Sequence, residues 1–539
     1  MRIKFLYFFL LCASITTAQP SYEWARNHAF SLNSYGWCVS HSLNKDLIVS
    51  GSFTGPFNDP DSTDMGGFII KYDSTGNLKW QKTYYSINGA IRTLNAVDKN
   101  GNIYITGWFG GIMQFDGNAL TGGGMYFIKY SPNGNLLFSK HITTIATPYE
   151  ICINSNNEIL ISGLCWPDSL FEGNVMHKDG FIAKYSSSGN FIWVKDFFLP
   201  ITSENNYDMC LDSTGNIFLT GDFSGNPFIT DSVQILSTGT RDGFIAKYDS
   251  EANLKWVKTI KGPGYEVPKC ITINNDKEIF VSGYYGSYSG TTLALFDSIS
   301  IASTVNNDIF ICKYDSSGNC KWVKMAGSDG IDAAREIYAD DSNVFITGYF
   351  GKYGQGNCNF EGQILNSTSG YTPDMFLANY DTDGNLKWVK GSYGGGGHGI
   401  DLTGNGRDLY LTGAFGGNFT FGDFSLTGNV DQVFVMKVKY DTIQTILTVP
   451  EKLYNDTELF TICPNPSQGI FVLKYMSIEK SSLQINISDI KGQIISRSNI
   501  PRVEGSYCKE IDLSRQAKGV YFIEIITDKN RQVKRVVLE

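Results

Sequence analysis

Two short phrases recur along most of this 539-residue chain. The first is clearest from Gly180 to Tyr185, which a turn ending in Gly189-Asn190 joins to Phe191–Lys195. The second runs from Asn102 to Phe109, and its glycine recurs at Gly51, Gly107, Gly163, Gly221, Gly283, Gly348 and Gly413. Such regular self-similarity is the signature of a repeat fold, in which each copy is one supersecondary unit.

Both phrases alternate as β-strands do. In Ile103–Thr106 the two isoleucines share one face of the predicted strand. The Gly-Asn pairs mark turns, because both residues tolerate positive φ at low cost. Each repeat is therefore expected to hold four short strands. In the second repeat we place them roughly at Leu94–Val97, Ile103–Phe109, Tyr126–Tyr130 and Leu136–His141.

The two ends of the repeat region predict how it closes. Tyr22–Arg26 matches the last strand of a repeat, whereas the final copy stops at its third strand, Phe434–Val438. An isolated four-stranded sheet cannot bury both faces, but sheets packed radially can. We therefore expect an all-β fold, a seven-bladed β-propeller over residues 20–441, with the N-terminal strand completing the last blade.

The pattern of the repeats resembles the SBBP-type β-propeller repeat of exported bacterial proteins. In that family a GN-[IV]-Y-[IV]-TG phrase precedes D-x-F-[IV]-x-KYD-x-x-GNL-x-W, and here the resemblance covers about residues 20–441. Phe138 in place of Trp, Asn379 in place of Lys and Val438 in place of Tyr depart from the pattern. We interpret these three as tolerated changes of the framework.

A different unit follows the repeats. Residues 442–458 are expected to be a linker, and residues 459–539 a small Ig-like β-sandwich of about seven strands. Its motifs resemble, in order, the type IX secretion C-terminal sorting domain. The residues that carry this resemblance are Pro464, Asn465, Pro466, Gly469, Asp489, Gly492, Gly519, Tyr521, Lys534 and Arg535. The resemblance implies that type IX secretion machinery is a partner, although a carbohydrate-binding or structural sandwich stays open as an alternative.

Residues 1–18 read as a secretory signal peptide. Arg2 and Lys4 precede the apolar stretch Phe5–Ala13, and small residues follow before Gln19. No later stretch is long and apolar enough for a transmembrane segment. The formal net charge is -9 and no block of Lys or Arg stands out, so no nucleic-acid partner is expected. We predict a secreted or cell-surface protein.

Export permits disulfides. Two pairs are candidates, Cys312 with Cys320 across a hairpin and Cys463 with Cys508 in the C-terminal unit. Cys152, Cys210 and Cys270 recur at similar places in successive repeats. We expect these three to be small buried hydrophobic residues.

No catalytic, metal or cofactor site is expected. The five His residues are scattered, and neither a zinc-protease motif nor a serine-hydrolase elbow is present. Asp381–Asn385 is interpreted as a turn, because a calcium loop needs further oxygen ligands and a distal Glu. Asp242, Asp308 and Asp374 precede third strands, where their short carboxylates are expected to fix turns.

Functional groups on a propeller usually lie on loops at the channel. The candidate ligand-facing loop residues are Tyr207, Asp208, Tyr265, Glu266, Asp332, Arg335 and His398. From them we expect a non-enzymatic binding protein for a glycan or a protein. Two alternatives stay open, namely a lyase or glycosidase that uses an acidic pair, and a purely structural surface component.

Overall fold

The computed structural model describes residues 19–538 except 31–32, 55–64, 88–91, 143–145, 198–206, 225–227, 231–232, 288–289, 353–356, 368–371, 441–458, 464–466, 468 and 528–530. The predicted signal peptide and Pro464, Asn465 and Pro466 therefore lie outside the described residues. The described chain falls into two compact units, residues 19–440 and residues 459–538. Every helix or strand assigned in them is a β-strand.

The first unit is built from antiparallel sheets of two to eight strands, and the larger ones resemble propeller blades. The first repeat contains β2 (Ser34–His41), β3 (Leu47–Thr54), β4 (Met65–Tyr72) and β5 (Leu78–Ile87). The second contains β6 (Arg92–Val97), β7 (Ile103–Phe109), β10 (Gly124–Tyr130) and β11 (Leu136–Ile142). The third contains β12 (Ala146–Ile153), β13 (Ile159–Cys165), β16 (Gly180–Tyr185) and β17 (Phe191–Phe197).

The same order continues through the later repeats. The fourth contains β18 (Tyr207–Leu211), β19 (Ile217–Phe223), β22 (Asp242–Tyr248) and β23 (Leu254–Lys261). The fifth contains β24 (Tyr265–Ile273), β25 (Ile279–Ser287), β28 (Asn306–Tyr314) and β29 (Cys320–Gly327). The sixth contains β30 (Ile331–Ala339), β31 (Val344–Lys352), β34 (Asp374–Tyr380) and β35 (Leu386–Gly394). The strands predicted for the second repeat are confirmed to within two residues.

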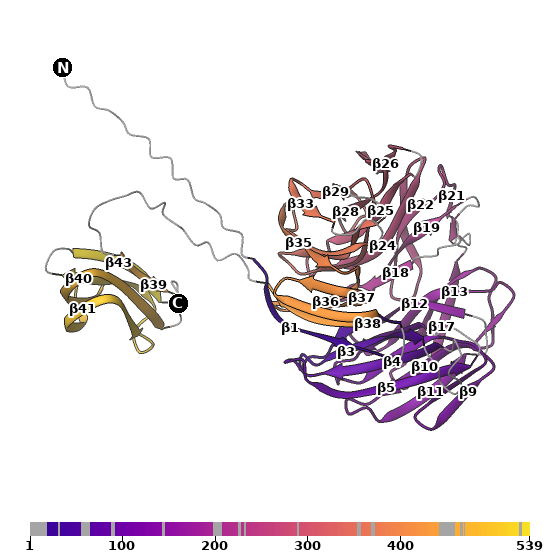
Figure 1. Ribbon diagram of the computed structural model, residues 1–539, viewed down its shortest axis with the longest axis horizontal. Helices are drawn as coiled ribbons and strands as arrows, with labels where there is room; N and C mark the ends of the chain where they lie inside the picture. The colour runs from indigo at the N-terminus through magenta and orange to yellow at the C-terminus, as the bar shows by residue number, and fades with distance from the viewer. Residues whose placement is uncertain are drawn as a thin grey trace, which may run out of the picture. The chain divides into compact units, whose positions relative to one another are not determined.

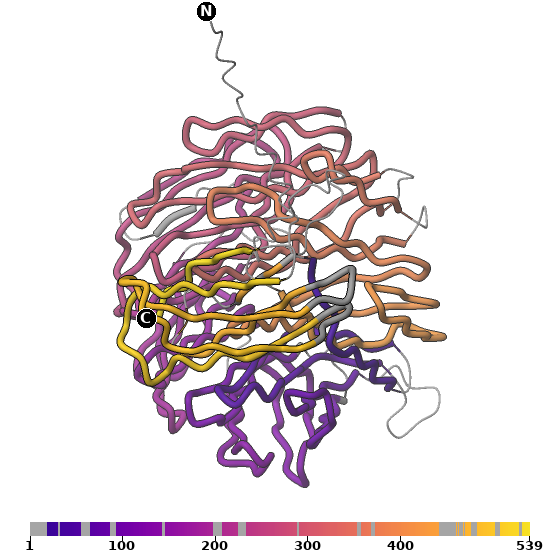
Figure 2. Tube along the Cα trace, turned by 90° about the vertical axis from the view of Figure 1, so that its left-hand side faces the viewer, coloured from indigo at the N-terminus to yellow at the C-terminus, as the bar shows by residue number. Residues whose placement is uncertain are grey.

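The last repeat is completed by the N-terminal strand, as predicted. It contains β36 (Gly397–Asn405), β37 (Asp408–Phe421) and β38 (Phe424–Lys439), and β1 (Ser21–His28) pairs antiparallel with β38. In Figure 1 the repeats follow one another around a common centre, and orange β38 lies beside indigo β1. Figure 2 shows the same indigo and orange segments side by side from another direction. Segments far apart in sequence are thus joined in one sheet.

Hairpins between the second and third strands bind adjacent repeats together. β8 (Ile112–Phe115) and β9 (Asn118–Thr121) of the second repeat extend the sheet of the first, because β8 pairs with β5. In the same way β26 (Leu293–Phe296) with β27 (Ile299–Ala302) extends β23, and β32 (Asn357–Phe360) with β33 (Gln363–Asn366) extends β29. β14 (Leu170–Phe171) with β15 (Asn174–Val175), and β20 (Phe228–Thr230) with β21 (Val233–Ile235), form separate two-stranded sheets.

Among the described residues, an aromatic side chain of five outer strands packs on the glycine turn of the next repeat, and this explains the recurring Gly-Asn and Trp positions. A Cβ added to Gly76, whose φ is +81°, would lie 2.6 Å from the Trp24 ring. The Trp24 indole also donates a hydrogen bond to the Ser74 carbonyl at 3.3 Å. The same ring-on-glycine contact joins Trp80 to Gly134, Phe138 to Gly189, Trp256 to Gly318 and Trp322 to Gly384. Phe138 therefore keeps the packing of the missing Trp without its hydrogen bond.

The turn of the fourth repeat departs from this arrangement. Ala252 stands where the neighbouring turns have Gly, and it keeps the positive φ of 56°. The indole N–H of Trp193, which packs in the same hydrophobic cluster, is buried with no hydrogen-bond partner. Because a Cβ in the left-handed region costs on the order of 1–2 kcal/mol, this turn is strained.

We predict that Ala252→Gly stabilises the protein by about 0.5–1 kcal/mol, since the relief of strain exceeds the added freedom of the unfolded chain. The matched control is Gly318→Ala, where an added Cβ would lie 3.1 Å from the Trp256 ring at a φ of +81°. This change should destabilise by about 1–2 kcal/mol. Urea unfolding of the mature chain measures both, and destabilisation by Ala252→Gly would contradict the interpretation.

The C-terminal unit is a small sandwich with its own core, which includes Phe471, Leu473 and Ile523. Its described residues form five strands rather than the expected seven, because two of them are long: β40 (Ile470–Asp489) and β41 (Ile494–Asp512). The others are β39 (Leu459–Cys463), β42 (Gly519–Thr527) and β43 (Arg531–Leu538). Among the predicted motif residues, Gly469 and Gly492 have positive φ at turns, and Lys534 and Arg535 are exposed on β43. Gly519 and Tyr521 lie on β42, and Asp489 ends β40.

Both candidate disulfides are corrected by strand register. Cys320 pairs with Tyr314 and Cys312 with Val323, and both thiols are free. Cys463 pairs with Val472 on one side of β40, whereas Cys508 pairs with Lys474 on the other. Strands separated by a third lie about 10 Å apart, beyond the roughly 7 Å that a disulfide spans between Cα atoms.

Candidate functional site

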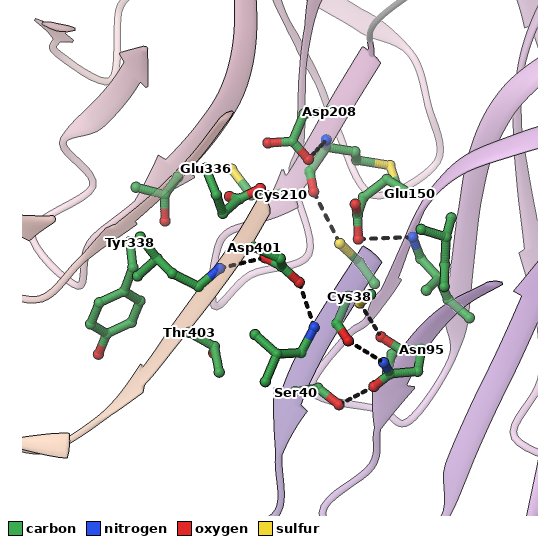
Figure 3. A pocket seen from close by; sticks show the side chains of 18 of the residues that line it. Cys38, Ser40, Asn95, Glu150, Asp208, Cys210, Glu336, Tyr338, Asp401 and Thr403 are labelled. Atoms are coloured by element: carbon green, nitrogen blue, oxygen red, sulfur yellow. Dashed lines mark hydrogen bonds between the residues drawn. The ribbon is translucent and has the colours of Figure 1, made fainter. Parts of the chain in front are cut away.

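The first strand of every repeat contributes to one cavity of about 490 Å³. Residues of β2, β6, β12, β18, β24, β30 and β36 line it, so these are the innermost strands of the repeat unit. Figure 3 shows carboxylates, thiols and hydroxyls from several of these strands around it. This cavity is the candidate functional site because all the repeats converge there.

Within the described part of the chain, five innermost strands carry a β-bulge at the same level. The registers shift between Gly36 and Cys38, Pro148 and Glu150, Pro268 and Cys270, Ala334 and Glu336, and Gly399 and Asp401. The extra residues are Trp37, Tyr149, Lys269, Arg335 and Ile400, and all five line the cavity. We call them the bulge ring. A bulge re-aims a side chain, so this repeated irregularity presents chemically different groups on one wall.

Aromatic neighbours hold the bulge ring in place. The ammonium of Lys269 lies 5.2 Å from the centre of the Tyr284 ring, and the Arg335 guanidinium 5.4 Å from that of Tyr349. Each is a cation–π contact. The Trp37 indole donates to the Ser52 hydroxyl at 2.6 Å. One part of the ring is thus cationic, and another part is aromatic.

Carboxylates occupy the next level of the cavity, at Glu150, Asp208, Glu336 and Asp401. Asp401 accepts the Val39 N–H at 2.6 Å and the Leu402 N–H at 2.7 Å. Asp208 accepts the N–H of Ile271 at 2.6 Å and that of Met209 at 2.7 Å. These two carboxylates therefore bridge the first strands of neighbouring repeats, and Figure 3 shows the Asp401 bonds.

Burial disfavours the charged forms of these acids. It raises the pKa of Asp208 to about 6 and that of Asp401 to about 7, although backbone N–H donors oppose the change. The pKa of Glu336 rises well above its usual range, through burial first and then the charges of Asp208 and Asp401. The carboxylates around the cavity consequently influence one another's protonation.

The predicted ligand-facing residues lie on inner strands rather than on loops, all but Arg335 among the first two residues of their strand. Tyr207, Asp208 and Arg335 line the cavity. Glu266 and Asp332 are fully buried and are not surface groups, which corrects their expected role. Tyr265 and His398 lie on inner strands outside the cavity lining. His398 packs against Tyr349, and its pKa is lowered to about 4, mainly by burial and then by Arg335 and Lys352.

Sequence reasoning missed Trp37, Tyr149, Lys269, Glu150, Glu336 and Asp401. The sequence shows how far each of these residues lies from the recurring glycine. It does not show the one-residue bulges that turn them towards the cavity, because a bulge has no sequence pattern of its own. The register also corrects the Cys alignment. Cys152 and Cys210 occupy equivalent positions in the registers of their inner strands, and both line the cavity. Cys270 lies two positions earlier in its own inner strand and is fully buried.

The Asp turns hold their own backbone. Asp381 accepts the N–H groups of Asp383 and Asn385 at 3.0 and 2.8 Å, as expected for a turn. Asp242 and Asp308 likewise accept the N–H groups of Thr238 and Thr304. In the part of the chain that the structure describes, no three His, Cys, Asp or Glu side chains converge as a metal site.

We predict that Glu336→Gln makes the folding stability of the protein fall less as the pH rises. A carboxyl with a raised folded-state pKa contributes stability below its unfolded pKa and loses it as the pH rises towards the folded value. Gln cannot ionise and can still accept the Ile337 N–H that Glu336 accepts at 3.0 Å. Relative to wild type, the variant should gain on the order of 1 kcal/mol between pH 5 and pH 8.

Urea unfolding at the two pH values measures this gain. The control is Glu251→Gln, because the Glu251 side chain is 63% exposed. An identical pH dependence of wild type and Glu336→Gln would contradict the electrostatic description of the cavity.

The chain has relatives among known proteins. It is similar to an uncharacterized WD repeat-containing protein, L264, of Acanthamoeba polyphaga mimivirus. The two are 25% identical, over 58% of this chain and 29% of the relative, so the chain spans under a third of that protein. Among solved structures, a streptogramin B lyase aligns with 11% identity and a TM-score of 0.37, over 78% of this chain and 98% of the lyase. A PL25 ulvan lyase aligns with 11% identity and a TM-score of 0.33, over 68% and 95%.

The C-terminal unit has a match of its own. Residues 461–539 match the family model described as the secretion system C-terminal sorting domain. None of the described residues forms a helix with the length and apolar character needed to cross a membrane. The C-terminal unit is therefore a type IX secretion sorting domain, and the protein is secreted across the outer membrane or to the cell surface.

Proposed function

We propose that this protein is an exported seven-bladed β-propeller of the SBBP type that binds an anionic glycan at the bulge ring. The repeat pattern and the pairing of β1 with β38 support the ring of seven. The observation that carries the binding function is the same bulge in five inner strands, which lines one cavity with Trp37, Tyr149, Lys269, Arg335 and Ile400.

The chemistry of the bulge ring suits an acidic sugar. Trp37 and Tyr149 offer flat apolar faces to a pyranose ring. Lys269 and Arg335 follow each other on the inner strands of adjacent repeats, where they can pair with a carboxylate or sulfate. Arg335 is exposed although its guanidinium is held over Tyr349. The site is therefore largely preorganised, which lowers the entropic cost of binding.

Catalysis is the competing function, because several acids line one cavity and a glycosidase or lyase needs such groups. The pKa values of Asp208 and Asp401, raised to about 6 and about 7, would suit proton transfer near neutral pH. However, the oxygens of both carboxylates accept backbone N–H groups from two neighbouring inner strands. This bridging role in the framework favours binding without turnover.

We predict that the mature chain binds uronate- or sulfate-bearing oligosaccharides, and that Arg335→Ala weakens binding on the order of tenfold through loss of a charge-assisted hydrogen bond. A glycan array identifies a binder, and calorimetry measures its affinity for wild type and variants. Lys321→Ala is the matched control, since Lys321 is an exposed cation that pairs with Asp315 on an outer turn.

Three results would count against the proposal. They are equal affinity of wild type and Arg335→Ala, equal binding of the uncharged version of the same oligosaccharide, and binding of no glycan on the array. Mass spectrometry of the oligosaccharide after incubation separates binding from catalysis, because shortened or unsaturated products would establish turnover instead.

A further inference from the structure

A second set of polar groups adjoins the bulge ring where the sixth repeat meets the seventh. Tyr349, on β31, packs against two side chains at once. The Arg335 guanidinium lies 5.4 Å from the centre of the Tyr349 ring, and the His398 ring lies 5.3 Å from it in an edge-to-face contact. His398 lies on β36, two residues before Ile400. Arg335 of the bulge ring and His398 are therefore neighbours held by one aromatic support.

A similar contact lies where the seventh repeat meets the first. Asp431, on β38, accepts a hydrogen bond from the Tyr35 hydroxyl at 2.7 Å. The Tyr35 ring is stacked on that of Trp37, another member of the bulge ring, with the ring centres 5.7 Å apart. Burial and then the bond to Asp431 raise the pKa of Tyr35 to about 12, so the hydroxyl keeps its proton.

Electrostatics link the two contacts. Burial first, and then the charges of Arg335 and Lys352, lower the pKa of His398 to about 4, whereas the Asp431 carboxylate opposes that change. Asp431 therefore lies within electrostatic reach of His398. Tyr35, His398 and Asp431, which we call the rim group, are all partly exposed. The rim group connects the cationic part of the bulge ring with its aromatic part.

The rim group has hydrogen-bonding capacity that the protein does not use. In the described part of the chain, neither ring nitrogen of His398 makes a hydrogen bond. The Asp431 Oδ2 atom accepts the Tyr35 hydroxyl, whereas Oδ1 accepts no bond from a described residue. A neutral imidazole offers one donor and one acceptor, and a carboxylate accepts several hydrogen bonds. Partly buried atoms of this kind are completed by water or by a ligand.

We propose that the rim group forms a second sugar subsite beside Lys269 and Arg335, which takes an uncharged sugar through its hydroxyl groups. The ligand is then a chain in which a neutral sugar adjoins the acidic one. A sugar hydroxyl both donates and accepts, as the imidazole and the carboxylate require. The rim group lies outside the cavity lining, so it extends the bulge ring, and this inference rests on the function proposed above.

A second acidic sugar is disfavoured at this subsite. Lys352 and Asp431 act on His398 with opposite signs, so the rim has no surplus positive charge for another anion. A carboxylate placed beside Asp431 would also meet a like charge, which costs binding free energy. The cationic pair of the bulge ring therefore selects the acid, and the rim group selects its uncharged neighbour.

On the other side of the bulge ring the polar groups bond to one another. Tyr149 packs against Tyr207 with the ring centres 5.8 Å apart, and the Tyr207 hydroxyl donates to the Asp222 carbonyl at 3.3 Å. The Asp222 carboxylate in turn pairs with Arg241 at 2.6 Å, and both side chains are buried. The chain of sugars is therefore expected to run from the fifth and sixth repeats across the seventh to the first.

The test compares three probes on the full mature chain: methyl glucuronoside, glucuronate linked to glucose, and glucuronate linked to a second glucuronate. Calorimetry measures their dissociation constants. For wild type, we expect glucuronate–glucose to bind about tenfold more tightly than methyl glucuronoside, because the rim group adds hydrogen bonds. Glucuronate–glucuronate should gain nothing over the single sugar.

His398→Ala should reduce the ratio of the first two dissociation constants from about ten to about one. His398→Gln keeps a donor and an acceptor and should restore most of the ratio. His177→Ala is the matched control, since His177 is exposed between β15 and β16 of the third repeat. Asp431→Asn removes the like charge but can still accept the Tyr35 hydroxyl, so glucuronate–glucuronate should then bind more tightly than methyl glucuronoside.

Three results would overturn the inference. They are a neutral sugar that adds no affinity in wild type, an unchanged ratio in His398→Ala, and equal binding of the two disaccharides by wild type. In each case the function proposed for the bulge ring still stands if Arg335→Ala weakens binding of methyl glucuronoside. If none of the three probes binds wild type, both proposals fail. If His398→Ala does not fold, the change of preference in Asp431→Asn decides the question.

Discussion

The contact on which the repeat unit most depends is the aromatic ring of one outer strand packed on the glycine turn of the next repeat. Trp80 on Gly134 and Trp256 on Gly318 are two examples of it. The turn must have positive φ, so glycine both permits the turn and leaves room for the ring. The same turns accept lysine hydrogen bonds from the preceding repeat, such as that from Lys71 to the Pro132 carbonyl at 2.9 Å. Local turn chemistry thereby sets the spacing between repeats.

The first and last repeats are joined by the same contact of an aromatic ring on a glycine turn. Trp24, on β1, packs on Gly76 as the other outer-strand rings do on their turns, while β1 pairs with β38. The hydrophobic cluster around it joins Tyr410 and Val435 near the end of the repeats to Val49 and Phe68 near the beginning. The ends are thus held by packing and by backbone pairing, which gives the central cavity fixed walls.

The inner strands have two roles, to hold neighbouring repeats together and to present side chains to the cavity. Asp208 and Asp401 stabilise the contacts between neighbouring inner strands through backbone N–H groups. The bulge ring presents chemically varied side chains at one level of the cavity. These residues are not bound by the packing that the core positions of all repeats share. Variation at a bulge changes what the wall presents without disturbing the core positions on either side. A repeat scaffold can in this way carry an asymmetric binding surface.

The repeats allowed much of this fold to be predicted, because strand alternation and turn residues are local signals. The strands of the second repeat and the pairing of Tyr22–Arg26 with the end of the repeat region followed from them. The site was less predictable. The sequence predicts Glu266 and Asp332 on ligand-facing loops at the channel, whereas both are fully buried residues of inner strands.

Other features of the site depend on register, which the sequence does not display. The bulges that place Lys269 and Trp37 in the cavity wall insert a single residue and have no compositional signature. The same applies to Cys270, which resembles Cys152 and Cys210 in approximate spacing but lies two residues away in register. In the C-terminal unit, motif order identified the domain, while the lengths of β40 and β41 did not follow from strand alternation.

Hydrogen–deuterium exchange of the mature chain, with and without a bound acidic oligosaccharide, tests most directly the claim that the bulge ring is the binding surface. The account predicts that the ligand slows exchange in peptides from the bulged inner strands, 34–41, 146–153, 265–273, 331–339 and 397–405, and leaves the outer hairpins 112–121 and 357–366 unchanged. Slowed exchange confined to those hairpins or to residues 459–538, with the inner strands unaffected, would contradict it.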